Sequence, residues 1–114
     1  MITNMDPRLA KLINAFQQKG WALKGSVDIS SDWWFSDILH LSSTWRPVGK
    51  DIYLTLLTDP QMLDRKVVWC IGISLNIPVN SQNNFIDQIT LNDINRDDLS
   101  SFVDNINKIA LVNI

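Results

Sequence analysis

The sequence predicts a single α+β domain, a two-layer sandwich in which two helices cover one face of a four-stranded antiparallel meander. Two observations support this fold. Amphipathic helical stripes stand near both ends of the chain, and the segments between them alternate apolar and polar residues with the period of two that is typical of strands. The predicted strands span 21–30, 37–45, 51–58 and 66–75, and the predicted helices span 6–19 and 96–111.

Both helices carry recognisable start signals. Asp6 suits the N-cap of the first helix, Pro7 suits its first position, and Gly20 suits the left-handed residue that ends it. Asn95 is predicted to cap the second helix. The apolar stripes are Leu9, Leu12, Ile13 and Phe16 in the first helix, and Leu99, Phe102, Val103, Ile106, Ile109 and Ala110 in the second.

Two segments fit more than one structure. Residues 31–45 match a helical and a strand template about equally, and we predict an irregular or helical turn over 31–36 followed by a strand over 37–45. The choice rests on Ser42, Ser43 and Thr44, which are poor helix formers, and on the strand from Asp51 that offers a partner. Residues 85–91 suit a short helix or a strand.

Strict alternation assigns the strand residues to two faces. The face predicted to lie under the helices comprises Trp21, Leu23, Val27, Ile29, Leu39, Leu41, Ile52, Leu54, Leu56, Trp69, Ile71 and Ile73. The opposite face comprises Lys24, Ser26, Asp28, His40, Ser42, Tyr53, Thr55, Leu57, Val68, Cys70 and Ser74. Because this second face mixes apolar and polar groups, we predict that it stays uncovered and meets another subunit, a partner protein or a ligand.

Composition restricts the function classes. A net charge of −2 without a dense basic patch argues against nucleic-acid binding. No apolar run approaches the roughly 20 residues needed to cross a bilayer. The start of the chain lacks the pattern of a signal peptide, and the single Cys70 cannot form an internal disulfide, so we expect a cytoplasmic protein. No metal or cofactor motif is recognised, and none is expected.

An aromatic segment is the sharpest functional signal in the sequence. Trp33, Trp34 and Phe35 cannot all enter one core from a regular strand, and Trp45 with Arg46 forms a second aromatic and basic pair. Tryptophan and arginine are enriched at the energetic centres of protein interfaces. These five residues predict a protein–protein interaction or adaptor module, which would act as a homodimer or bind another protein; the other interpretation is that the rings cover a sheet edge.

A small-molecule pocket is the alternative prediction. His40, Tyr53, Thr55 and Cys70 share the second face, and Cys70 beside a histidine base would be a candidate nucleophile. The spacing is not specific, since a cysteine in an apolar strand usually serves packing and a lone histidine usually makes a surface hydrogen bond. The alternative function is therefore a small-molecule binding protein or a weak enzyme, and of these two we favour binding without catalysis.

Overall fold

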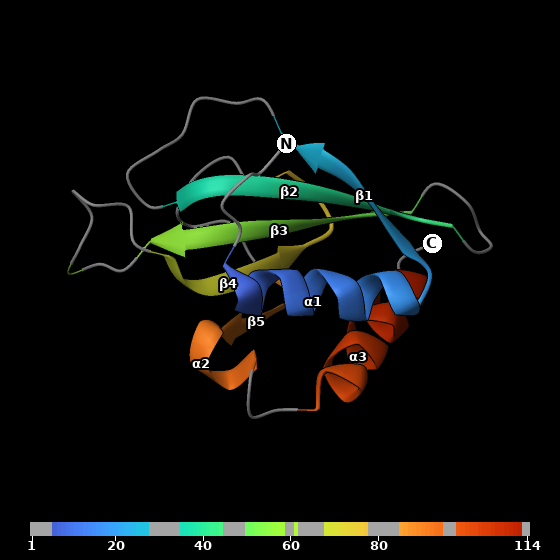
Figure 1. Ribbon diagram of the computed structural model, residues 1–114. Coiled ribbons are helices and arrows are strands. Elements are labelled where there is room, and N and C mark those ends of the chain that lie inside the picture. Colours follow the sequence, from blue (N-terminus) through green and yellow to red (C-terminus); the bar gives the residue numbers. More distant parts are fainter. Residues whose placement is uncertain are drawn as a thin grey trace.

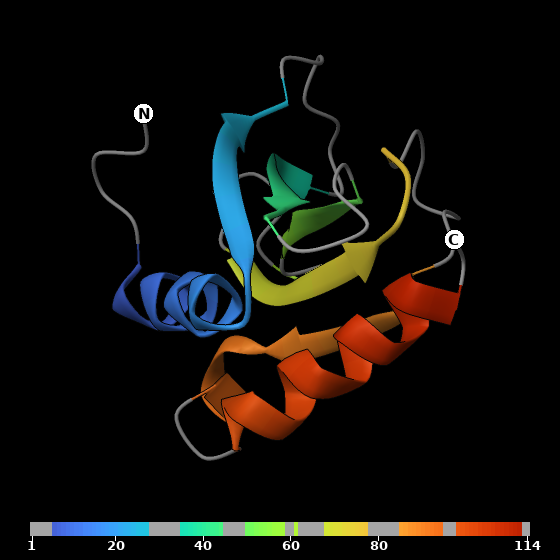
Figure 2. The same cartoon turned by 90° about the vertical axis from the view of Figure 1, so that its right-hand side faces the viewer.

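The structure is a five-stranded antiparallel sheet with its helices on one side. The computed structural model describes residues 6–27, 35–44, 50–58, 61, 68–77, 85–94 and 98–112. The elements in chain order are α1 (Pro7–Gln18), β1 (Trp21–Ser26), β2 (Phe35–Ser43), β3 (Asp51–Thr58), β4 (Val68–Ser74), β5 (Asp87–Thr90), α2 (Leu91–Ile94) and α3 (Leu99–Val112). The strands are hydrogen-bonded in sequence order, and Figures 1 and 2 show the helices together on one side. The predicted α+β class with an antiparallel sheet is confirmed, whereas the predicted number of four strands is wrong.

Helix α1 begins and ends as the sequence predicts. The Asp6 carboxylate accepts a hydrogen bond from the Arg8 backbone N–H at 2.8 Å, and Pro7 occupies the first helical position. Gly20 follows the last turn with φ of 98°, a conformation that glycine adopts without a steric penalty. The apolar stripe of α1 is buried against the sheet, so this helix is fixed by its caps and by its packing.

Replacing Asp6 with alanine is expected to lower the free energy of unfolding by about 1 kcal/mol, the typical value of an N-cap. The Arg8 side chain hydrogen bond lowers the pKa of Asp6 below its ordinary value of 3.8. A carboxyl whose pKa is lowered by folding stabilises the fold above the unfolded pKa, and this contribution disappears as the pH falls through the folded pKa. Urea titrations at pH 7 measure the loss in Asp6→Ala. Repeated from pH 7 to pH 2 with Asp6→Asn, which lacks the charge but can still cap, they would show this variant and wild type converging in stability below about pH 4. A constant difference over that range would contradict the assignment.

A bulge in β1 reverses the predicted facing of its last residues. Leu23 pairs with Leu41, but the next pair is Gly25 with His40, so Lys24 is an extra residue in the ladder. Gly25 has φ of 125°, where a side chain would be strained. Beyond the bulge Val27 packs on Ile38, away from the helices, and its predicted place on the helical side is therefore wrong. Ile29 and Asp28 lie outside the described residues.

The described part of the ambiguous segment 31–45 forms strand β2. It runs from Phe35 to Ser43, so Phe35 and Ser36 belong to the strand and not to the predicted helical turn. The remainder of that predicted turn, over 31–34, lies outside the described residues, as does Trp45. Leu39 and Leu41 are buried on the helical side, as the alternation predicts.

A second bulge lies in β4. Leu57 of β3 pairs with Cys70, and the next pair is Thr58 with Val68, so Trp69 has no partner in the register. Val68 packs against the main core, and the Trp69 side chain is 44% exposed. Strict alternation therefore assigned Val68 to the wrong face, and the prediction that Trp69 is buried under the helices is wrong. Ile71 and Ile73, on the C-terminal side of the bulge, are fully buried under the helices as predicted.

The C-terminal third supplies the fifth strand and two helices. The segment from Phe85 to Leu91 contains strand β5, which pairs with β4, and the start of helix α2. Helix α3 begins at Leu99 rather than at 96, with Asp98 as its cap, and the predicted cap Asn95 lies outside the described residues. The Asp98 carboxylate accepts hydrogen bonds from the Ser100 backbone N–H at 3.0 Å and from the Ser101 hydroxyl at 3.2 Å.

One apolar core joins the helices to the sheet. Trp21 is buried in this core and donates its indole N–H to Asn107 Oδ1 of α3 at 2.6 Å. Lys19 and Asp104 form an ion pair of 3.3 Å at the surface, which also joins α1 to α3. The core side chains are Leu9, Leu12, Ile13, Phe16, Trp21, Leu39, Leu41, Ile52, Leu54, Leu56, Ile71, Ile73, Ile89, Leu91, Ile94, Leu99, Val103, Ile106 and Ala110.

The second sheet face is covered more than predicted. Ile38 on this face is 1% exposed and is contacted by Val27, Tyr53, Leu57 and Phe85. Thr55, Cys70 and Ser74 on the same face are also buried. The prediction of an uncovered, partly apolar sheet face is therefore wrong for its central part.

Candidate functional site

The exposed Trp69 side chain marks the first candidate site. Trp69 and Ile77 are the large hydrophobic side chains that stand exposed among the described residues. Trp69 is the extra residue of the β4 bulge, and it stays exposed while its neighbour Val68 packs against the core. A bulge that re-aims one side chain is a common device beside functional surfaces.

A depression of about 290 Å³ adjoins the Trp69 ring. Its walls come from the start of α1, the start of β4 and helix α2, and its lining residues are Arg8, Val68, Trp69, Leu91 and Asn92. We name this surface the Trp69 patch. It combines apolar side chains with two polar ones.

The Arg8 side chain in the Trp69 patch is held on both sides. Its Nε and Nη2 donate to the two carboxylate oxygens of Asp6 at 3.1 and 3.0 Å, and its Nη1 donates to Asn92 Oδ1 at 3.2 Å. The paired Asp6 carboxylate raises the pKa of Arg8 further, so the guanidinium stays charged. These bonds fix the position of Arg8 before any partner arrives.

The predicted His40 and Tyr53 come together on the second sheet face. They are directly paired across β2 and β3, and their rings stack with centroids 4.9 Å apart and an interplanar angle of 15°. Asp51 Oδ1 lies 2.8 Å from His40 Nε2, and because a carboxylate can only accept, Nε2 carries the hydrogen. Burial, aided by the Asp51 charge, raises the pKa of Tyr53, so its phenol stays neutral.

Cys70 does not join His40 in a catalytic pair. Leu57, four residues along β3 from Tyr53, is the partner of Cys70, and four residues of strand span about 13 Å. The Cys70 sulfur is instead 3.9 Å from Gln88 Oε1 and 4.0 Å from its neighbour's carbonyl oxygen. Burial is the main cause that raises the pKa of the thiol. A thiol without a nearby base, kept protonated, is poorly suited to nucleophilic catalysis.

Native Cys70 is expected to react with a disulfide reagent such as DTNB at least about 100-fold more slowly than the unfolded chain at pH 8, because modification requires opening of the sheet. The thiol is 2% exposed and its pKa is raised by burial. Absorbance at 412 nm with and without guanidinium chloride would measure both rates. Rapid labelling of the folded protein would restore the reactive-cysteine hypothesis.

Thr55 lies on β3 between Tyr53 and the partner of Cys70, and its hydroxyl differs from those of other buried polar residues. It is fully buried, and its hydroxyl Oγ1 has no hydrogen-bond partner. By contrast, the buried Ser74 hydroxyl donates to the carbonyl of Asn76 at 2.7 Å, and the buried Ser43 hydroxyl accepts from the N–H of Lys50 at 3.2 Å. Of the four residues predicted for the pocket, the structure therefore brings His40 and Tyr53 together, buries Thr55 beside Tyr53 on β3, and separates Cys70.

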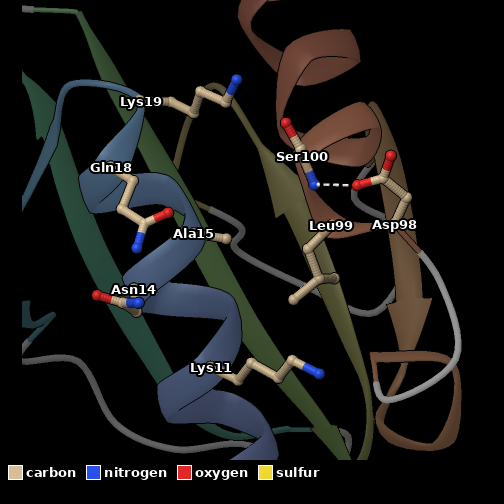
Figure 3. A pocket seen from close by; sticks show the side chains of 8 residues that line it. All are labelled: Lys11, Asn14, Ala15, Gln18, Lys19, Asp98, Leu99 and Ser100. Atoms are coloured by element: carbon tan, nitrogen blue, oxygen red, sulfur yellow. Dashed lines mark hydrogen bonds between the residues drawn. The ribbon is translucent and has the colours of Figure 1, made fainter.

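A groove of about 310 Å³ runs between α1 and the start of α3 (Figure 3). Ala15 and Leu99 point toward one another across it, and Lys11 of α1 and Lys19 just after that helix extend toward the side of α3. The backbone N–H of Ser100 at this helix start is already bonded to Asp98. The full lining is Lys11, Asn14, Ala15, Gln18, Lys19, Asp98, Leu99 and Ser100. Because the Asp98 carboxylate takes up the helix start, the groove offers no ready anion site.

The predicted aromatic segment is described only in part. Trp33, Trp34, Trp45 and Arg46 lie outside the described residues, and Phe35 is described as a backbone position of β2. Sequence reasoning missed the Trp69 patch because it placed Trp69 in the core. The polar connection before the apolar run was the one available signal, since strands often bend or bulge near their ends.

Several classes of site are absent from the described part of the chain. No group of three or more histidine, cysteine or acidic side chains is placed to hold a metal ion there. No helix found in those ranges is long and apolar enough to span a bilayer. Comparisons with protein-family models, with curated proteins and with solved structures gave no match to this chain.

Proposed function

We propose that the protein is a protein–protein interaction module that pairs with a second copy of itself through the Trp69 patch. One observation carries the proposal: a tryptophan ring, 44% exposed, stands at a strand bulge directly beside a depression lined in part by Arg8. Burying an exposed tryptophan is among the largest single gains available to an interface. The predicted interaction module is thus retained, with a contact site that differs from the predicted one.

The polar part of the patch supports binding through preorganisation. Arg8 is already fixed by Asp6 and Asn92, so a partner that contacts it does not pay for ordering a long side chain. The Arg8 hydrogens that face Asp6 and Asn92 are used, which leaves the flat guanidinium face for stacking on an aromatic ring. A second tryptophan suits that face better than an acidic group does.

The shape of the patch favours a second copy as the partner. A twofold contact uses the same patch on both subunits, so the patch must carry both a projection and the hollow that receives it. The Trp69 patch has both, because the exposed ring stands at the rim of its own depression. In the proposed dimer, Trp69 of each copy packs against Arg8 and Leu91 of the other.

Replacing Trp69 with alanine is expected to weaken self-association by about 2 kcal/mol or more, roughly a 30-fold increase in the dissociation constant, which is the effect of losing an interface hot spot. Sedimentation equilibrium over a wide range of protein concentrations measures this constant. Ile77→Ala is the matched control, since Ile77 is 41% exposed but lies outside the Trp69 patch. A wild-type protein that stays monomeric at several hundred micromolar would refute the proposal, as would equal association by the Trp69→Ala variant.

The aromatic segment keeps its predicted role as a second proposed contact. Trp33, Trp34 and Phe35, together with Trp45 and Arg46, remain candidates for the same reason as before, namely their residue types and spacing. Trp34→Ala in the same sedimentation assay separates the two contacts, because it should leave association unchanged if the Trp69 patch acts alone.

We further infer a cytoplasmic location, since the single cysteine is buried as a free thiol.

A further inference from the structure

Thr55 is a polar residue that the fold buries without giving its side chain a hydrogen bond. Its side chain is fully buried, and within the described residues its hydroxyl is the buried side-chain oxygen that lacks a partner. A valine of nearly the same shape would fill the position without leaving a polar atom desolvated. An unpaired buried polar group of this kind breaks the usual rule of hydrogen-bond satisfaction, and such violations are typical of functional positions.

The ring of Phe85 lies against both residues that flank Thr55 across the sheet. Thr55 stands in the middle of a row across the sheet, paired with Ile38 on one side and with Gly72 on the other. Phe85 packs against Ile38, and its ring atoms come within 2.8 Å of the place where a Gly72 side chain would begin. A ring that touches both neighbours in the row must cross the position between them, because adjacent strands are only about 4.8 Å apart.

We name the space that this ring occupies above Gly72, Thr55 and Ile38 the slot. Gly72 contributes only backbone to its floor, and Ile38 and Thr55 contribute an apolar side chain and a hydroxyl. Phe85 itself is only half-buried, so one side of its ring borders solvent. The phenyl ring fills the slot but cannot give the Thr55 hydroxyl a proper hydrogen bond.

We propose that the slot is a binding site for a small planar molecule, an aromatic or heteroaromatic ring with one hydrogen-bonding group, which replaces the Phe85 ring and bonds to the Thr55 hydroxyl. The apolar floor accepts the ring, and the missing partner of Thr55 selects the polar group. This site is on the sheet face opposite the helices and does not depend on the Trp69 patch.

Phenol and benzene are matched probes, because they share the ring and differ by one hydroxyl. Titration of the wild-type protein, followed through amide ¹H–¹⁵N spectra, is expected to shift the signals of Thr55, Gly72 and Ile86 with both probes. Phenol is expected to bind about five- to tenfold more tightly than benzene, the effect of one net hydrogen bond. Thr55→Val should abolish this preference, and Thr44→Val, at an exposed threonine, should preserve it.

Phe85→Ala removes the competing ring and provides the second measurement. Both probes should bind this variant at least about tenfold more tightly than they bind wild type, with the same dependence on Thr55. If neither protein shows shifts at these amides, the slot is not a binding site. If phenol and benzene bind equally, or if Thr55→Val leaves the phenol preference intact, the hydroxyl is a packing feature and the proposal fails.

Discussion

Replacing Phe16 with alanine is expected to lower the free energy of unfolding by about 3 to 5 kcal/mol, the largest effect of any single change considered for this chain. Phe16 is fully buried where α1 packs on the sheet, and its removal leaves a cavity that rigid strands cannot fill. Since domains of this size are stable by only about 5 to 15 kcal/mol, the variant would lose a large share of its stability. Urea unfolding followed by circular dichroism measures the loss.

The neighbouring Gln17→Ala variant is the control for Phe16. Gln17 is exposed on the same helix, so its replacement should change the free energy of unfolding by no more than about 0.5 kcal/mol. If Phe16→Ala cost as little as this control, α1 could not pack on the sheet as described. The comparison therefore tests the docking of α1 and not only its helical propensity.

Replacing Gly72 with alanine is expected to lower stability by about 1 to 3 kcal/mol, because the new methyl group would overlap the Phe85 ring. The ideal position of the added carbon is 2.8 Å from two ring atoms of Phe85 and 2.9 Å from a third. The ring must move, which also uncovers Ile38 on the second sheet face. Guanidinium chloride unfolding measures the change.

The change in stability caused by Gly72→Ala is expected to reverse its sign in a protein that also carries Phe85→Ala. The three atoms nearest to the added methyl group all belong to the Phe85 ring and are absent in this variant. Because alanine restricts the unfolded chain more than glycine does, the same change should then stabilise by about 0.5 to 1 kcal/mol. The double-mutant cycle isolates the coupling between the two positions. Equal costs in both backgrounds would show that the ring does not lie on Gly72.

Much of the fold follows from local signals in the sequence. The two ends of α1 depend on Asp6 and Pro7 at its start and Gly20 after its last turn, whose chemistry acts within a few residues and is independent of tertiary context. The alternation of Ile52, Leu54 and Leu56 likewise survives intact, because β3 is central and its helical face is fully buried. Where propensity was ambiguous, in residues 35–43, the pairing with β3 decided in favour of a strand.

The errors in assigning side chains to sheet faces come from bulges, which a strict two-residue alternation does not include. One extra residue at Lys24 and another at Trp69 shift the ladder. The first shift moves Val27, which follows it, away from the predicted face, and the second does the same to Val68, which precedes it. Nothing at Trp69 itself distinguishes a bulged tryptophan from a buried one. The start of α3 was predicted too early, since Asn95 and Asp98 are equally good capping residues by type and the sequence does not distinguish them.

The candidate site was predictable only in its residue types. An interface based on tryptophan and arginine was expected, but the pair that the described residues bring together is Trp69 with Arg8, which lie far apart in the sequence. The contact of Phe85 with Ile38 and Gly72 depends on the path of the chain into β5, a segment that the sequence left open. Long-range contacts of this kind have no local signature.

The two outermost strands, β1 and β5, have a consequence for concentrated solutions. One carries an inserted lysine and a left-handed glycine, and the other is only four residues long. Neither presents the long, flat row of free backbone groups that templates growth of cross-β fibres. We therefore expect crowding to drive this protein toward discrete, reversible assemblies that dissolve on dilution.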